Sequence, residues 1–148
     1  MTPDYIALLD MATDMGVWVD VDDVGWLPTQ SKGGWFPEHD LILLARNLNP
    51  VEEMCTLAHE LGHAALGHTT DVDGWFAQRQ ERAADQWAAR LLVSPAEYEA
   101  AERLHGPHVG GIAHELGVTT HILATWQDLY ERSPYESQRH KTPSPSKI

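Results

Sequence analysis

The sequence predicts an α+β fold in which a small, mostly antiparallel sheet packs on a helix that carries an H-E-x-x-H motif, with about five helices in all. Three observations lead to this prediction. Apolar residues recur at helical spacing between 50 and 67, valines alternate with other residues between 17 and 21, and a second helical run covers 81–92. A chain of 148 residues is long enough to bury a sizeable core.

The N-terminal third supplies the sheet. Residues 2–16 read as a short helix that a glycine ends, and 17–21 read as a half-buried strand. Two further strands are expected at 34–36 and 40–44. One edge of this sheet is expected to border the functional cleft, where an edge strand can hold an extended peptide. Three tryptophans of this region are expected in the core: Trp18, Trp26 and Trp35.

The central helix has a clear start and end in the sequence. Asn49 is a good N-cap, Pro50 suits the first helical position, and Glu52 completes a capping box. Gly67 can end the helix. One face carries apolar residues at helical spacing, namely Met54, Leu57, Ala58, Leu61 and Ala65.

The H-E-x-x-H motif lies in the middle of this helix. His59 and His63 are four residues apart, so they project from one face and can bind one Zn²⁺ together. Glu60 lies beside that face and can reach a water on the metal. Metallopeptidases use this motif in that way. The alternative is two solvent-facing histidines on an ordinary helix.

A second copy of the first four letters begins at His114, but Val118 occupies the position where a second histidine would be needed. We therefore expect no metal site there. Cys55 lies one turn before His59 and is a conceivable fourth ligand. We interpret it as a buried apolar residue, because a catalytic zinc keeps its fourth position open.

A third protein ligand is expected from the second helical run. Glu81 and Asp85 are four residues apart and share a face. If the two helices pack together, Glu81 can complete the metal site and Asp85 can accept the outer N–H of a ligand histidine. The alternative is a surface ion-pair face with neighbouring arginines. His68 is the rival third ligand, and we interpret it instead as a local structural or supporting residue.

These segments resemble the ImmA/IrrE family of metallopeptidases. The stretch 56–63 reads T-L-A-H-E-L-G-H, and 81–95 reads E-R-A-A-D-Q-W-A-A-R-L-L-V-S-P, close to the family pattern E-x-x-A-N/D-x-F-A-A-x-L-L-M-P. Trp87 stands at the usual phenylalanine, and Val93-Ser94 precedes the proline. The resemblance is strong over 51–95 and looser on either side.

The resemblance implies a zincin-like fold and zinc-dependent cleavage of a transcriptional repressor inside the cell, often in prophages or mobile elements. It implies that His59, His63 and Glu81 bind zinc and that Glu60 is the catalytic base. The alternative is a catalytically silent, zinc-bound regulator that acts by binding a repressor. Three residues are candidates for stabilising the oxyanion: Tyr98, His68 and His105.

Composition limits the partners. The net charge of −12 argues against a nucleic-acid or acidic-membrane partner and is compatible with a basic polypeptide. A single cysteine excludes an intramolecular disulfide and suits the cytoplasm. No stretch is apolar enough for a membrane span, and the N-terminus lacks a signal-peptide pattern. The sequence does not predict the oligomeric state.

The C-terminal part is expected to hold two helices and a tail. Residues 109–130 resemble a helix-turn-helix, but 106–131 contain no lysine or arginine, which argues against DNA binding. We interpret this segment as a packing pair that closes the domain or meets a protein partner. The expected domain is 1–132, followed by a disordered, proline- and serine-rich tail over 133–148.

Overall fold

The computed structural model describes residues 2–132 and confirms the α+β class. The predicted tail, 133–148, lies outside the described residues. The described elements, in chain order, are α1 (Tyr5–Asp14), β1 (Trp18–Val21), β2 (Gly33–Phe36), the 3-10 helix η1 (Pro37–His39), β3 (Leu41–Leu44), α2 (Pro50–Ala65), α3 (Gly74–Leu92), α4 (Pro95–His105), α5 (Val109–Leu116) and α6 (Thr120–Arg132).

The sheet has three strands in the order β1-β3-β2 and is mixed rather than mostly antiparallel. β2 and β3 are antiparallel, whereas β1 and β3 run parallel. The reason lies in β3, which is the most apolar strand and whose Ile42, Leu43 and Leu44 are all buried. The central position buries β3 best, so β1 pairs with it instead of with β2. β2 is consequently an edge strand.

The prediction that the early tryptophans belong to the core is wrong for two of them. Trp18 is 74% exposed and Trp26 is 57% exposed. Trp18 lies on an edge strand and Trp26 in the loop between β1 and β2, where little chain covers them. Trp35 is partly buried against the core, and its Nε1–H donates to the carbonyl oxygen of His68 at 3.0 Å.

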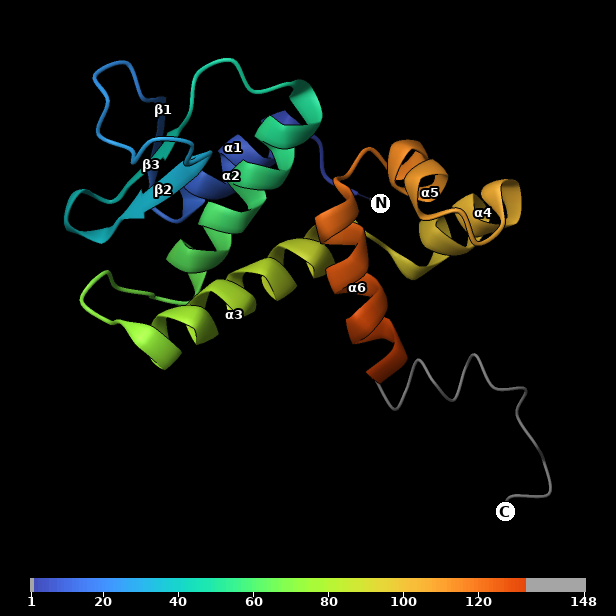
Figure 1. Cartoon of the computed structure of the whole chain (residues 1–148). Helices are drawn as coiled ribbons and strands as arrows, with labels where there is room; N and C mark the ends of the chain where they lie inside the picture. Colours follow the sequence, from blue (N-terminus) through green and yellow to red (C-terminus); the bar gives the residue numbers. More distant parts are fainter. Residues whose placement is uncertain (1, 133–148) are drawn as a thin grey trace.

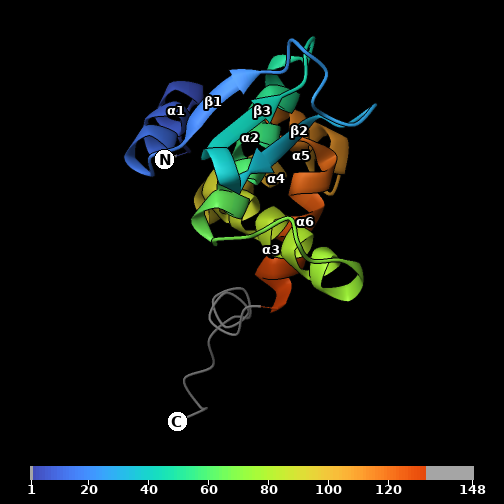
Figure 2. The same ribbon diagram turned by 90° about the vertical axis from the view of Figure 1, so that its left-hand side faces the viewer.

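Helix α2 lies against the sheet, with α1 beside β1 (Figure 2). It begins with the predicted capping box, because the Asn49 side chain accepts from the Glu52 N–H and the Glu52 carboxylate accepts from the Asn49 N–H. Leu57, Ala58 and Leu61 are fully buried. Burying this apolar stripe stabilises the helix that carries the motif.

Helix α3 packs closely on α2, and α6 in turn crosses α3 (Figure 1). Small residues allow the first approach. Ala84 and Ala88 are fully buried, and a Cβ placed on Gly62 would lie 3.0 Å from the carbonyl oxygen of Ala84. The predicted helical pair 109–130 is present as α5 and α6, with Ile112, Leu123 and other apolar residues buried. No helix among residues 2–132 has the length and hydropathy needed to traverse a bilayer.

Candidate metal centre

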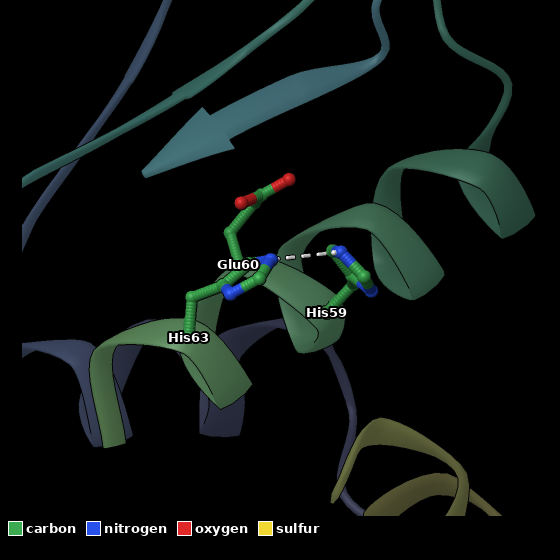
Figure 3. Close-up of side chains that lie close together, drawn as sticks. All are labelled: His59, Glu60 and His63. Carbon is green, nitrogen blue, oxygen red and sulfur yellow. Dashed lines mark hydrogen bonds between the residues drawn. The ribbon is translucent and has the colours of Figure 1, made fainter. Parts of the chain in front are cut away.

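The H-E-x-x-H residues meet at one point on α2. Potential ligand atoms of His59, Glu60 and His63 all lie within 4.8 Å of one another. The two imidazole rings are nearly perpendicular, at 85°, with their Nε2 atoms 3.2 Å apart, and the carboxylate of Glu60 extends from α2 toward the sheet (Figure 3). Three potential metal-binding groups on two turns of one helix are therefore already close together.

Helix α3 brings a carboxylate to the same point. Glu81 Oε1 lies 3.3 Å from His59 Nε2, and Glu81 Oε2 lies 2.7 Å from His63 Nε2. Ligand atoms placed tetrahedrally at 2.0–2.1 Å from zinc are roughly 3.3 Å apart. The distance from Glu81 to His59 matches this value and the distance from Glu81 to His63 is shorter, so the three side chains are close enough to bind one ion.

Neighbouring residues orient both histidines. The Nδ1–H of His59 donates to Asp85 Oδ1 at 2.8 Å, and His63 Nδ1 lies 2.8 Å from His68 Nδ1. Because each Nδ1 is engaged outward, each Nε2 is directed to the shared centre. Partners of this kind fix the tautomer of metal-binding histidines, so the donor set fits a divalent ion such as zinc.

The electrostatics of the centre favour a positive charge between the rings. Burial opposes the charged form of His59, but hydrogen bonds with Asp85 and Glu81 outweigh it and raise its pKa to about 10. Hydrogen bonds from His59 and His63 lower the pKa of Glu81 well below its usual range. The carboxylates of Glu81 and Asp85 thus remain ionised and stabilise a cation here, whether it is a proton or a metal ion.

Glu60 differs from Glu81 in its surroundings. Only 6% of Glu60 is exposed, and burial raises its pKa despite the opposing effect of the two histidines. The edge strand comes close to it, because a Cβ on Gly33 would lie 2.6 Å from Thr56 Cγ2 and 3.4 Å from Glu60 Cγ. A buried carboxylate with a raised pKa holds an accepted proton better than an exposed one.

Two hollows meet at Glu60 and Glu81. The first has a volume of about 390 Å³ and is lined by β2 and by the loop after α2, including Trp35 and His68. The second has a volume of about 350 Å³ and is lined by α2, α3 and the start of α6, including His121. Each lies within the size range of ligand pockets. Glu60 therefore lies inside a cleft, and the edge strand borders it as predicted.

Comparison with known proteins identifies the family of this chain. The family model described as IrrE N-terminal-like domain matches residues 12–125, most of the chain. The chain belongs to this family. The matched region contains both α2 and α3, so this IrrE-like domain carries its His-Glu-His group where the two helices meet.

A curated relative is the radiation response metalloprotease IrrE of Deinococcus radiodurans. It is 31% identical over 125 residues, an alignment that covers 78% of this chain and 36% of the relative. This IrrE-like domain thus spans about a third of the length of that protein. A solved structure, a Mycobacterium tuberculosis transcriptional regulator, matches with a TM-score of 0.62 and 19% identity over 88% of this chain and 42% of the other. It supports the fold.

Two sequence-predicted candidates, Tyr98 and His105, lie away from the centre. The hydroxyl of Tyr98 accepts from Gln127, and the His105 ring pairs with Glu115, both among α4, α5 and α6. Of the three candidates for oxyanion stabilisation, His68 is the one that lines the cleft. Cys55 is buried, as predicted, and lines the second hollow.

One residue of the site was missed by sequence reasoning. His121, near the start of α6, donates from Nε2 to Asp85 Oδ2 at 2.9 Å. Burial would raise the pKa of Asp85, but hydrogen bonds from His59 and His121 lower it overall. The contact spans 36 residues of sequence, and no local pattern marks it. Only the packing of α6 on α3 reveals it.

Proposed function

We propose that the chain is a zinc-dependent metallopeptidase that cleaves a transcriptional repressor. The observation that carries this proposal is the convergence of His59 Nε2, His63 Nε2 and the Glu81 carboxylate on one point, with Glu60 buried beside it in a cleft. Membership of a metalloprotease family supports it.

In this proposal His59, His63 and Glu81 hold the metal, and Asp85 and His68 fix the two imidazole rings. Two histidines with one glutamate form a ligand set of catalytic zinc sites. When bound, zinc supplies a Lewis acid that polarises a peptide carbonyl and acidifies water.

Glu60 performs the proton transfers in this proposal. Its carboxylate accepts a proton from the attacking water and returns that proton to the leaving amine nitrogen. The raised pKa caused by burial helps Glu60 to keep the proton between these two events. Of the three candidate residues, His68 lines the cleft and is the one proposed to donate a hydrogen bond to the developing oxyanion.

The edge strand supplies a way to hold a polypeptide. Among residues 2–132, β2 pairs only with β3, and Gly33, Gly34 and Trp35 line the first hollow. An extended segment can add to such an edge by main-chain hydrogen bonds, which places a peptide bond near Glu60. The hollows on either side of Glu60 can then take side chains from both sides of the scissile bond.

A repressor substrate in the cytoplasm is the narrower part of the proposal. The net charge of −12 suits a basic polypeptide, and DNA-binding proteins carry basic surfaces. The start of α6 would face DNA in a helix-turn-helix. Here His121 and Ile122 of α6, together with the preceding Thr119, instead line the second hollow. This placement supports a protein partner rather than direct DNA binding.

Terminal-amine labelling of the source organism's proteome tests the proposal. The extract is incubated with the zinc-loaded protein or with its Glu60→Gln variant, and new N-termini are identified by mass spectrometry. We expect new N-termini in a DNA-binding repressor with the wild type alone. Glu115→Gln is the matched control and should cleave like the wild type. If the wild type creates no new N-termini while a repressor co-purifies intact, the chain is a binding regulator and the peptidase assignment fails.

A further inference from the structure

The carboxylate of Asp85 accepts hydrogen bonds from histidines of two other helices. His59 Nδ1 of α2 lies 2.8 Å from Oδ1, and His121 Nε2 of α6 lies 2.9 Å from Oδ2. Asp85 itself is on α3 and its side chain is 23% exposed. A continuous chain of contacts therefore joins α6 to the metal centre.

We propose that His121 is a positioning residue of the metal centre: it holds the Asp85 carboxylate, which in turn holds the ring of His59. The inference rests on the proposed metal-binding role of His59. It concerns the affinity for the metal, and it is testable without a substrate.

The physical reason is the freedom of an aspartate side chain. The terminal torsion of aspartate is broad, so one hydrogen bond at one oxygen leaves the carboxylate plane poorly defined. A second donor at the other oxygen fixes that plane. With the plane fixed, Asp85 Oδ1 stays in line with the Nδ1–H of His59, and His59 Nε2 stays directed at the centre.

His121 is well placed for this task because its helix is anchored on both sides of it. Thr119 Oγ1 accepts from the N–H of Ile122 at the start of α6. Ile122 and Leu123 are buried at 2% and 0% exposure. The backbone of His121 is therefore held in place although its own side chain is 69% exposed.

Because the His121 side chain is exposed, its effect on metal affinity can be measured separately from any effect on folding. Exposed ion pairs contribute little to stability, so removal of the imidazole should leave the fold intact. A change in metal affinity would then report the position of Asp85. His114 is an exposed histidine of the same helical pair, on α5, and provides a matched control.

The test is a double-mutant cycle on zinc affinity, measured by competition with a chromogenic chelator. We expect Asp85→Ala to weaken binding about 10- to 100-fold, as for other partners of metal-binding histidines. His121→Ala, one contact further out, should weaken it about three- to tenfold. The double variant should bind zinc like Asp85→Ala alone, because His121 acts through Asp85. His121→Gln, which keeps an N–H donor at similar reach, should recover most of the affinity, and His114→Ala should match the wild type.

Circular dichroism confirms that each variant is folded, and the visible spectrum of the Co²⁺-substituted protein gives a second readout. A changed Co²⁺ spectrum in His121→Ala, recovered in His121→Gln, supports positioning. Equal zinc affinity in His121→Ala and the wild type overturns the inference, as does a further loss when His121→Ala is added to Asp85→Ala. In both cases the proposed function survives. A folded wild type that binds no zinc overturns the proposed function and this inference together.

Discussion

The same four letters, H-E-L-G, occur twice in this chain and have different structural roles. In α2 they begin at His59, and Glu60 and His63 are buried at the candidate metal centre. In α5 they begin at His114, where that histidine and Glu115 are exposed and Glu115 pairs with His105. Identical local sequence therefore does not define a site.

The difference arises from the role of the glycine in each copy and from the elements that pack on it. Gly62 is inside α2 and meets the backbone of Ala84, which brings α3 and its carboxylates close. Gly117 instead ends α5 in the left-handed conformation, with φ of 70°. The next residue, Val118, turns into the core at 5% exposure. One glycine serves helix packing, and the other serves helix termination.

The largest difference in peptidase activity is expected between substitutions of Glu60 and of Glu115, the glutamates of the two copies. We expect Glu60→Gln to retain zinc and to lose peptidase activity by about 10²- to 10⁴-fold, because the amide cannot accept the proton of the attacking water. Glu115→Gln should be as active as the wild type. Cleavage rates of the repressor identified by N-terminal labelling provide the measurement, in preparations shown free of other proteases. Comparable rates for Glu60→Gln and wild type would contradict the role of Glu60.

Substitution of Gly62 should reduce both the stability of the fold and the affinity for zinc. Gly62→Val places atoms against the Ala84 backbone, so we expect a loss of about 1–3 kcal/mol in unfolding free energy and weak zinc binding, as α3 is displaced. Urea unfolding and zinc titration measure both effects. Normal zinc affinity in Gly62→Val would show that the close approach of α2 and α3 is dispensable for the site.

A smaller effect on zinc affinity is expected from substitution of His68, which contacts the histidine pair of α2. Its Nδ1 lies 2.8 Å from His63 Nδ1, so His68→Ala should free the His63 ring and weaken zinc binding about tenfold. His105→Ala, which removes the histidine beside the second copy, should leave zinc affinity unchanged. Equal affinities of these two variants would argue that His68 does not support the centre.

The smallest effect is expected at the end of α5. Gly117→Ala forces a residue with a Cβ into the left-handed region, which costs about 1–2 kcal/mol of unfolding free energy. Zinc affinity should match that of the wild type, because the strain falls outside the metal centre. Thermal unfolding of the metal-free and zinc-loaded forms measures both quantities. A loss of zinc binding here would mean that α5 and the centre are coupled.

The elements that sequence reasoning predicted well are set by local interactions. The capping box at Asn49 and the apolar stripe of α2 lie within one helix, and the four-residue spacing of Glu81 and Asp85 needs only the helical repeat. The convergence of Glu81 with the two histidines was predicted only on condition that α2 and α3 pack together. Small residues at that contact, such as Gly62 and Ala84, make the condition hold.

The features that sequence reasoning missed depend on contacts between distant segments. The parallel pairing of β1 with β3 follows from competition for the central position in the sheet, which no single strand reveals. The exposure of Trp18 and Trp26 follows from the small size of that sheet. His121 meets Asp85 only because α6 crosses α3, so its place in the site follows from tertiary packing.

Metal content tests the central claim most directly. Zinc per chain is measured by elemental analysis in the purified wild type, in Glu81→Ala and in the control Glu115→Ala, after zinc addition and removal of excess. The account predicts near-stoichiometric zinc in the wild type and the control, and a large loss in Glu81→Ala, because Glu81 reaches both His59 and His63. Full zinc content in Glu81→Ala would contradict the proposed ligand set. A folded wild type that holds no zinc would contradict the proposal that the chain is a zinc-dependent metallopeptidase.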